Sequence, residues 1–157
     1  DLAGCSNSIG SLTGGGSVTL GEGSITIGND NTSPAAFTGV ISGEGGVSKT
    51  GTGTLILTAT QTYAGNTAIY GGTLRIDNAY LADTSDVFLA GGARFNLNFA
   101  GTDTIRHLYF DGAPQLKGTW GATGSGAEYI NDTYFTGTGK LLVTRGPDLH
   151  GTTIIVR

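Results

Sequence analysis

Apolar and polar residues alternate over short stretches of this chain with a period of two residues. In the stretch Thr54-Leu55-Ile56-Leu57, the side chains of Leu55 and Leu57 fall on one face. In Thr73-Leu74-Arg75-Ile76, Leu74 and Ile76 share a face and Arg75 points the other way. Glycine, asparagine, aspartate and serine bound these stretches, which is typical of short β-strands. The alternation predicts strands at Ser17–Leu20, Ser24–Ile27, Ala36–Ile41, Gly46–Lys49, Thr54–Thr58, Thr67–Ile69, Thr73–Ile76, Val87–Leu89, Arg94–Phe99, Ile105–Phe110, Lys140–Thr144 and Thr153–Arg157.

The strands recur within a repeated phrase of glycine, threonine and branched apolar residues. Its central copies begin at Gly53, Gly71 and Gly91, and a spacing of about 20 residues is typical of a solenoid. Stacked in register, the inward apolar pairs would form ladders along one continuous core. No stretch has the apolar spacing of an amphipathic helix. The sequence therefore predicts an all-β fold, a single-stranded parallel β-helix.

An antiparallel sandwich or jelly roll is the alternative architecture. Such a fold needs tight hairpin turns of the Asn-Gly or Asp-Gly type between longer strands. Only Asp111-Gly112 offers that signal. Short strands with glycine, asparagine or threonine corners dominate 46–97 instead, which favours the β-helix.

Composition narrows the class of protein. Glycine accounts for 29 of the 157 residues, and charged residues for only 13%. The net charge is −4 and no basic cluster is present, so we expect no nucleic-acid partner. No apolar run is long enough for a transmembrane segment. The chain lacks methionine, so we expect a processed or partial product, and the composition suits a secreted protein of a bacterial surface or extracellular matrix.

The candidate chemistry is sparse. The two histidines, His107 and His150, lie far apart, and Cys5 is the lone cysteine, so the sequence predicts no metal site or other cofactor and no disulfide framework. Cys5 has three open roles, which are a small buried residue, an intermolecular disulfide and a lipid attachment point. The carboxylates fall mostly in corners, where they stabilise turns. We therefore expect no enzymatic activity, with a polysaccharide-active enzyme as a distant alternative.

Aromatic residues suggest a second kind of function. A strip of them on the outer face of a solenoid would stack on sugar rings of a cell-surface glycan. Trp120, in the stretch Gly118-Thr119-Trp120-Gly121, is the candidate glycan contact, and the alternative is that it covers the core. The other candidates for the strip are Tyr63, Tyr70, Tyr80, Tyr109, Tyr129 and Tyr134.

The stretch from Phe37 to Ile76 resembles a known family. It reads FTGVISGEGGVSKTGTGTLILTATQTYAGNTAIYGGTLRI and is similar to the autotransporter-associated β-strand repeat, also called the passenger-associated transport repeat. Two positions depart from the family pattern, because Ala59 replaces a glycine and Gln61 an asparagine. The matching positions are Lys49, Gly51, Gly53, Leu55, Leu57, Tyr63, Gly65, Thr67, Ile69, Gly72 and Leu74.

The resemblance extends more weakly over about residues 10–144. It implies a right-handed parallel β-helix that bacteria secrete or display, in which the repeat is linked to export and carries no catalytic residues. The translocator barrel of an autotransporter is not recognisable in this sequence. We expect a structural solenoid, either a passenger stalk or a subunit of a surface fibre, with an adhesin or carbohydrate-binding module as the alternative.

The C-terminal residues fall beyond the family pattern and divide the chain into a solenoid domain, 1–144, and a linker and strand, 145–157. The β-branched run Thr153, Ile154, Ile155 and Val156 either pairs within its own chain or exchanges onto the open edge of a neighbouring copy. No helix caps either end of the predicted solenoid, so the module would be free to stack head to tail. Since such a contact does not close, the sequence predicts a homopolymeric filament.

Overall fold

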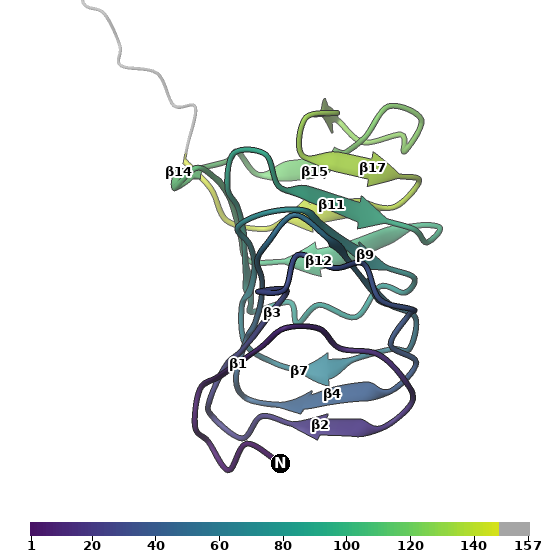
Figure 1. The fold of residues 1–157 in the computed structure, drawn as a ribbon. Helices are drawn as coiled ribbons and strands as arrows, with labels where there is room; N and C mark the ends of the chain where they lie inside the picture. Colours follow the sequence, from purple (N-terminus) through teal and green to yellow (C-terminus); the bar gives the residue numbers. More distant parts are fainter. Residues whose placement is uncertain (148–157) are drawn as a thin grey trace, which may run out of the picture.

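The computed structural model describes residues 1–147, which fold as a β-solenoid of stacked coils (Figure 1). Each coil passes through three faces and then returns to the first face about 20 residues further on. No helix occurs within these described residues, and so none there could span a membrane. The all-β, parallel β-helix prediction is confirmed. The predicted strand Thr153–Arg157, with its proposed exchange, lies outside the described residues.

Sheet A runs along the whole stack and takes one strand from each coil. Its six parallel strands are followed by the short antiparallel β14, Ala113–Pro114. The parallel register places Ile27, Lys49, Ile69 and Leu89 in one inward column. The parallel strands are β1 Asn7–Ile9, β3 Ile25–Ile27, β5 Val47–Lys49, β8 Thr67–Ile69, β10 Asp86–Leu89 and β13 His107–Phe110.

Sheet B forms the second face and contains the clearest alternation. It consists of β6 Thr54–Leu57, β9 Thr73–Ile76, β11 Arg94–Leu97 and β17 Phe135–Gly137, all parallel. The register stacks Leu55, Leu74, Phe95 and Phe135 into a fully buried ladder. Each of these side chains contributes roughly 1.5–3 kcal/mol by leaving water. Arg75 points outward, as the sequence predicts.

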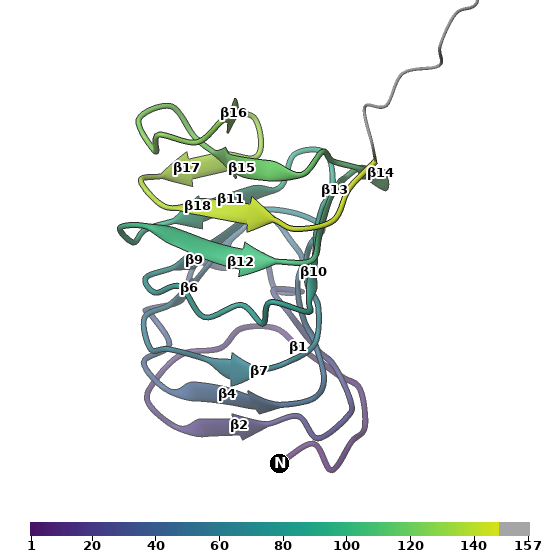
Figure 2. The same ribbon diagram turned by 180° about the vertical axis from the view of Figure 1, so that it is seen from behind.

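The third face is divided between two sheets (Figure 2). Sheet C contains β2 Ser17–Thr19, β4 Val40–Gly43 and β7 Thr62–Tyr63, whereas sheet D contains β12 Thr102–Ile105, β18 Lys140–Val143, β15 Gly118–Gly121 and β16 Tyr129–Ile130. On the third face, the coil between β7 and β12 contributes residues 78–84, and these residues form no strand. The Asp103 carboxylate bridges this gap, because it accepts hydrogen bonds from the backbone N–H groups of Tyr80 and Leu81, both at 3.0 Å. Burial raises the pKa of Asp103.

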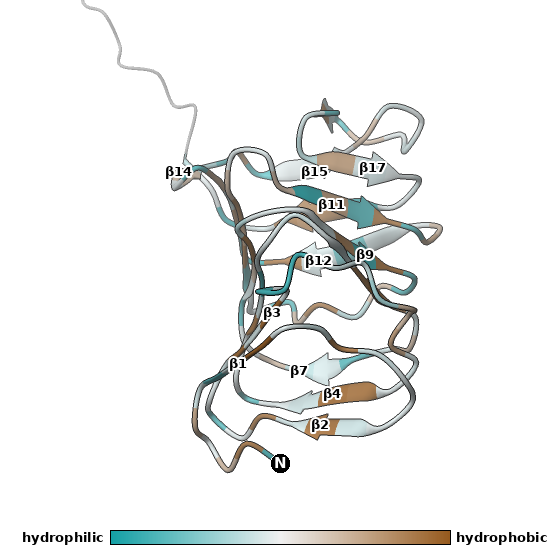
Figure 3. Ribbon diagram, in the orientation of Figure 1, coloured by the Kyte–Doolittle hydropathy of each residue, from teal (hydrophilic) through white to brown (hydrophobic). Residues whose placement is uncertain are grey.

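Hydrophobic side chains from all three faces meet in one core. Figure 3 shows hydrophobic residues within strands such as β2, β4 and β17, between more hydrophilic stretches of the ribbon. The prediction of one continuous strand over Ile105–Phe110 is wrong, because this stretch belongs to two strands. The chain turns a corner at Arg106, between β12 on sheet D and β13 on sheet A. The Arg106 guanidinium binds both oxygens of Asp86 at 2.9 Å, which fixes this corner.

The C-terminal end of the stack is closed by residues 111–134, an excursion between β13 and β17. Asp111 and Gly112 take positive φ angles of 49° and 80°, as a type I′ hairpin turn requires, and β14 folds back on β13. Strand β15 then pairs antiparallel with β18. Within residues 1–147 no further strand pairs with the outer edges of β14, β16 and β17, but Phe135 and Trp120 are buried, so side chains cover the core at this end. The expectation that the module stacks head to tail stays a prediction.

The N-terminal end of the stack is open by comparison. Strands β1 and β2 are the last strands of sheets A and C, and within residues 1–147 no strand pairs with their outer edges. One contact covers part of β2, where the Leu2 N–H donates to the Thr19 carbonyl at 2.8 Å. Ile9 and Val18 are only half-buried, although the inward residues of later coils are buried. A further coil stacked here would complete the burial of this end.

Candidate functional site

The repeat-like stretch forms a coil in the middle of the stack. It runs from β5 on sheet A through β6 and β7 and returns to sheet A at β8. Its apolar positions Leu55, Leu57 and Ile69 are buried. Its glycine at position 53 is fixed by the neighbouring coil, because a Cβ atom there would overlap the carbonyl oxygen of Thr32. The motif positions therefore describe how one coil packs on the next.

The repeat lysine is a structural residue. Lys49 ends β5 with its side chain turned into the coil, and only 1% of its surface is exposed. Its ammonium group donates to the carbonyl oxygens of Thr50, Gly51 and Gly71, the last two at 3.2 and 3.3 Å. Burial lowers the pKa of Lys49. The charged group therefore satisfies the carbonyls of a corner shared by two coils.

Replacement of this lysine gives a direct test of its role. We expect Lys49→Met to lower the free energy of unfolding by about 2 kcal/mol, since three inward carbonyls lose a charged donor. Chemical denaturation measures this change, and Lys117→Met, at an exposed lysine, is the matched control. Equal stability of the two variants would show that the corner does not depend on the ammonium group.

The two departures from the family pattern lie in one corner, and Gln61 has a clear role there. Its side chain is buried, and its Oε1 accepts a hydrogen bond from the Ile41 N–H at 2.6 Å. Its Nε2 donates to the carbonyls of Ala59 at 2.7 Å and Gly39 at 3.3 Å. The longer amide therefore links this coil to the preceding one. The coil retains the β-helix geometry with both substitutions present.

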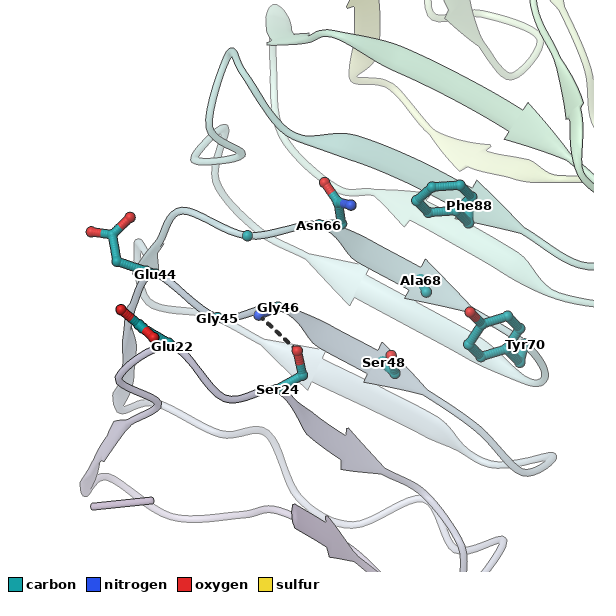
Figure 4. A pocket seen from close by; sticks show the side chains of 11 residues that line it. Glu22, Ser24, Glu44, Gly45, Gly46, Ser48, Asn66, Ala68, Tyr70 and Phe88 are labelled. Atoms are coloured by element: carbon teal, nitrogen blue, oxygen red, sulfur yellow. Dashed lines mark hydrogen bonds between the residues drawn. The ribbon is translucent and has the colours of Figure 1, made fainter. Parts of the chain in front are cut away.

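A groove lies on the outer face of sheet A and is the main hollow of functional interest. Its volume is about 350 Å³, and it crosses several coils (Figure 4). The outward column of sheet A places Ser48, Ala68, Phe88 and Tyr109 in register on successive coils. The small side chains of Ser48 and Ala68 leave the hollow, and Phe88 bounds it. The full lining is Glu22, Ser24, Glu44, Gly45, Gly46, Ser48, Gly65, Asn66, Ala68, Tyr70 and Phe88.

Opposite sides of the groove differ in chemistry. Tyr70, directly after β8, is 59% exposed and lies beside the groove with Phe88. Phe88 stacks on Tyr109 with ring centroids 4.7 Å apart. On the other side, Glu22 and Glu44 lie at the same corner of neighbouring coils and are exposed. The groove thus has an aromatic side and an acidic side.

The floor between these sides is polar and close to the backbone. Gly45 lies so near the preceding coil that a Cβ atom would overlap the Gly23 carbonyl oxygen, so no side chain can fill this part of the groove. Asn66 accepts a hydrogen bond from the Asp86 N–H at 2.8 Å through its Oδ1, which leaves its amide nitrogen as a donor. Ser24 accepts from the Gly46 N–H at 3.2 Å and keeps its own hydroxyl proton for another partner.

Trp120, the predicted glycan contact, lies in the closed end of the stack. It is only 8% exposed and packs against Tyr129 and Phe110, with ring centroids at 4.6 and 5.4 Å. Its indole N–H donates to the Leu116 carbonyl at 2.9 Å. This position agrees with the alternative that Trp120 covers the core. A glycan contact at this residue stays a prediction that the packing disfavours.

The proposed aromatic strip is not continuous, because the structure places its members in different environments. Tyr63 is buried, its hydroxyl lies 2.7 Å from the Thr67 hydroxyl, and burial raises its pKa to about 12. Tyr134 stacks on Phe110 in the closed end. Of the predicted strip, Tyr70 lines the groove and Tyr109 supports it from behind Phe88.

Sequence reasoning did not single out Phe88, Glu22 or Glu44. The signal for Phe88 was present, since alternation between Val87 and Leu89 directs it outward. Glu22 and Glu44 are brought to the same side of the groove only by the stacking of coils, and no local sequence pattern predicts this arrangement.

Several carboxylates of the chain are engaged in structural contacts. Asp86 binds Arg106 and His107, and the hydrogen bond from Arg106 lowers its pKa despite burial. Asp111 accepts from the Tyr134 hydroxyl at 2.6 Å, and Asp132 accepts from the Thr123 N–H at 2.7 Å. These contacts support corners and the closed end of the stack.

The remaining candidates for metal or covalent chemistry are separate from the groove. The Asp30 carboxylate accepts hydrogen bonds from the Thr32 N–H and hydroxyl at 3.0 and 2.9 Å, as in a polar turn. Within the described residues, no three histidine, cysteine or acidic side chains are grouped as metal ligands. Cys5 is an exposed free thiol, and His150 lies outside the described residues.

Comparison with known proteins agrees with this geometry. The passenger-associated transport repeat family matches residues 47–76. A relative described as "Adhesin BmaC autotransporter", from Brucella suis biovar 1 (strain 1330), is 37% identical over 153 residues. The alignment covers 92% of this chain and 4% of that much longer protein. No solved structure matches significantly.

The family match and the coil geometry cover the same part of the molecule. Residues 47–76 run from the start of β5 to the end of β9, through one full circuit of the solenoid. The autotransporter relative extends the similarity to the coils on both sides. This chain is thus a β-solenoid that belongs with the passenger-associated transport repeat proteins.

Proposed function

We propose that the chain is a non-enzymatic, structural segment of a surface-displayed autotransporter passenger. The observation that carries this proposal is the position of the repeat at 47–76, as a complete coil within an unbroken stack. Each coil of a solenoid packs only on its two neighbours, so a rod can be lengthened by adding coils. This property suits a stalk. The name of the autotransporter relative supports an extracellular location at the cell surface.

Surface display is testable in the bacterium that produces the protein. Antibodies raised against the purified chain should label intact cells, and added protease should remove the labelling. A periplasmic protein serves as the control for cell integrity and should stay protected. Labelling that appears only after the cells are permeabilised would overturn this proposal.

Self-assembly is a second candidate function, which the open N-terminal end favours. Its half-buried Ile9 and Val18 and the outer edges of β1 and β2 are suited to an added strand. We infer that a second copy of the chain occupies this edge and supplies its segment Thr153–Val156. In this proposal the donor is the C-terminal segment, because its β-branched run is a strong strand former. Such a contact propagates in one direction and yields a filament.

Sedimentation velocity over a concentration series, with negative-stain electron microscopy, tests this assembly. The full chain should grow into filaments, whereas a chain ending at residue 147 should stay monomeric. Ile155→Asp should act like the truncation, because a charge interrupts the apolar strand, and it leaves the described fold untouched. A full chain that remains monomeric at high concentration, or a truncated chain that assembles equally well, would contradict the proposal.

A further inference from the structure

The groove on sheet A has features of a ligand site that the stalk does not require. A purely structural coil would be stable with bulky or polar side chains on its outer face. Here the groove combines a 59%-exposed tyrosine, Tyr70, with two exposed carboxylates, Glu22 and Glu44, around a floor that backbone contact keeps empty. The position of the floor at Gly45 is fixed by the stacking itself, so the hollow is a permanent feature of the fold.

The aromatic side fits the apolar face of a sugar ring. The faces of aromatic rings carry partial negative charge and attract the weakly positive C–H groups of a pyranose. Tyr70 offers such a face at the surface, while Phe88 beside the groove is held by its stack on Tyr109. An aromatic pair anchored on successive strands presents a rigid surface and loses little conformational freedom on binding.

The polar groups of the groove match the hydroxyl groups of a sugar. The carboxylates of Glu22 and Glu44 accept hydrogen bonds, and the Asn66 amide nitrogen and the Ser24 and Ser48 hydroxyls donate them. Among residues 1–147, neither glutamate forms an ion pair. Both acceptors are thus available to a ligand.

Charge restricts the type of glycan. Two carboxylates on one side of the groove, on a chain of net charge −4, repel uronate, sialate and sulfate groups. An extended peptide would instead seek the free edge of a sheet, where backbone groups are unpaired. In the groove, strands β3, β5, β8 and β10 are all paired on both sides, so the backbone offers no such edge.

We propose that this groove binds an uncharged oligosaccharide, with one sugar ring against Tyr70 and the hydroxyl groups of a ring further along the saccharide on Glu22 and Glu44. The site goes beyond the proposed stalk function, which neither requires nor excludes it. It would give the segment an adhesive activity at a defined place on its outer face. Because binding is measured on the purified chain, its outcome is independent of surface display.

The test is isothermal titration of the full chain with hexasaccharide probes. The neutral probes are cellohexaose, maltohexaose and the hexamer of N-acetylglucosamine, and the anionic probe is a hyaluronan hexasaccharide. At least one neutral probe should bind, and the anionic probe should bind at least tenfold more weakly. Absence of binding by all three neutral probes, or preferential binding of the anionic probe, would overturn the proposal.

Variants connect the binding to the groove. Tyr70→Ala should weaken binding about tenfold through the loss of the stacking face, whereas Ile130→Ala, at an exposed apolar residue of sheet D, should not. The double change Glu22→Gln and Glu44→Gln should weaken the neutral probe and narrow discrimination against the anionic one. Glu128→Gln, at an exposed glutamate elsewhere, is its control. Unchanged binding in both groove variants, with folding verified by thermal unfolding, would place the ligand elsewhere and refute the assignment.

Discussion

Gly53→Ala is expected to lower the free energy of unfolding by about 3 kcal/mol, near the upper end of the range for overpacking. The added methyl group would overlap the Thr32 carbonyl oxygen of the preceding coil, and a backbone atom cannot move aside as a flexible side chain can. Two coils would have to separate locally, which weakens the packing on both sides. Chemical denaturation of the purified variant measures the loss.

Gly16→Ala is the matched control for this prediction. A Cβ atom at Gly16 meets no atom within 4 Å, and its φ lies outside the left-handed region. We expect its stability to change by less than about 1 kcal/mol, because only the entropy of the unfolded chain is affected. Similar losses in the two variants would mean that the glycines act through backbone flexibility and not through close coil contact.

Phe95→Ala is expected to cost about 3–5 kcal/mol, the range for removing a fully buried aromatic side chain. Phe95 lies in β11 between Leu74 and Phe135 and is completely buried. In a solenoid each coil is held mainly by its two neighbours, so a cavity here separates the repeat coil from the closed end. The expected result is a lower midpoint of thermal unfolding.

Phe88→Ala provides the comparison on the other face of the same coil. Phe88 stacks on Tyr109 at the surface, and we expect its loss to cost about 1 kcal/mol. The inward and outward phenylalanines differ by only a few positions along the chain, so the contrast isolates burial. A Phe88→Ala effect as large as that of Phe95→Ala would contradict the assignment of inner and outer faces.

The sequence was sufficient to predict the strands that carry the alternation. Strands such as β6, β9 and β11 have apolar residues at every second position, and this local pattern fixes which face is buried. The alternation did not identify strands that are defined by pairing with a neighbouring strand and not by apolar residues. Strand β12 begins Thr102-Asp103-Thr104 and has a single apolar residue, Ile105, so nothing local distinguishes it from a loop.

The closed end and the groove escaped prediction for a related reason. Strand β15 is held by β18, about 20 residues further along the chain, and the glycines around it resemble turn signals. The Asp111-Gly112 hairpin was visible in the sequence, but its role as part of a cap was not. Likewise, Glu22, Asn66 and Tyr70 come together only when three coils are stacked in the correct register.

Amide hydrogen exchange of the purified chain, resolved strand by strand, tests most directly that the repeat coils form a stack closed at one end and open at the other. We expect slow exchange in the inner strands β8 and β10, and comparable protection in β15 and β18 because they pair with each other. Strands β1 and β2 should exchange fastest, since their outer edges are unpaired and their apolar residues Ile9 and Val18 are only half-buried. Exchange in β15 and β18 as fast as that in β2 would contradict the closed end, and with it this account of the molecule.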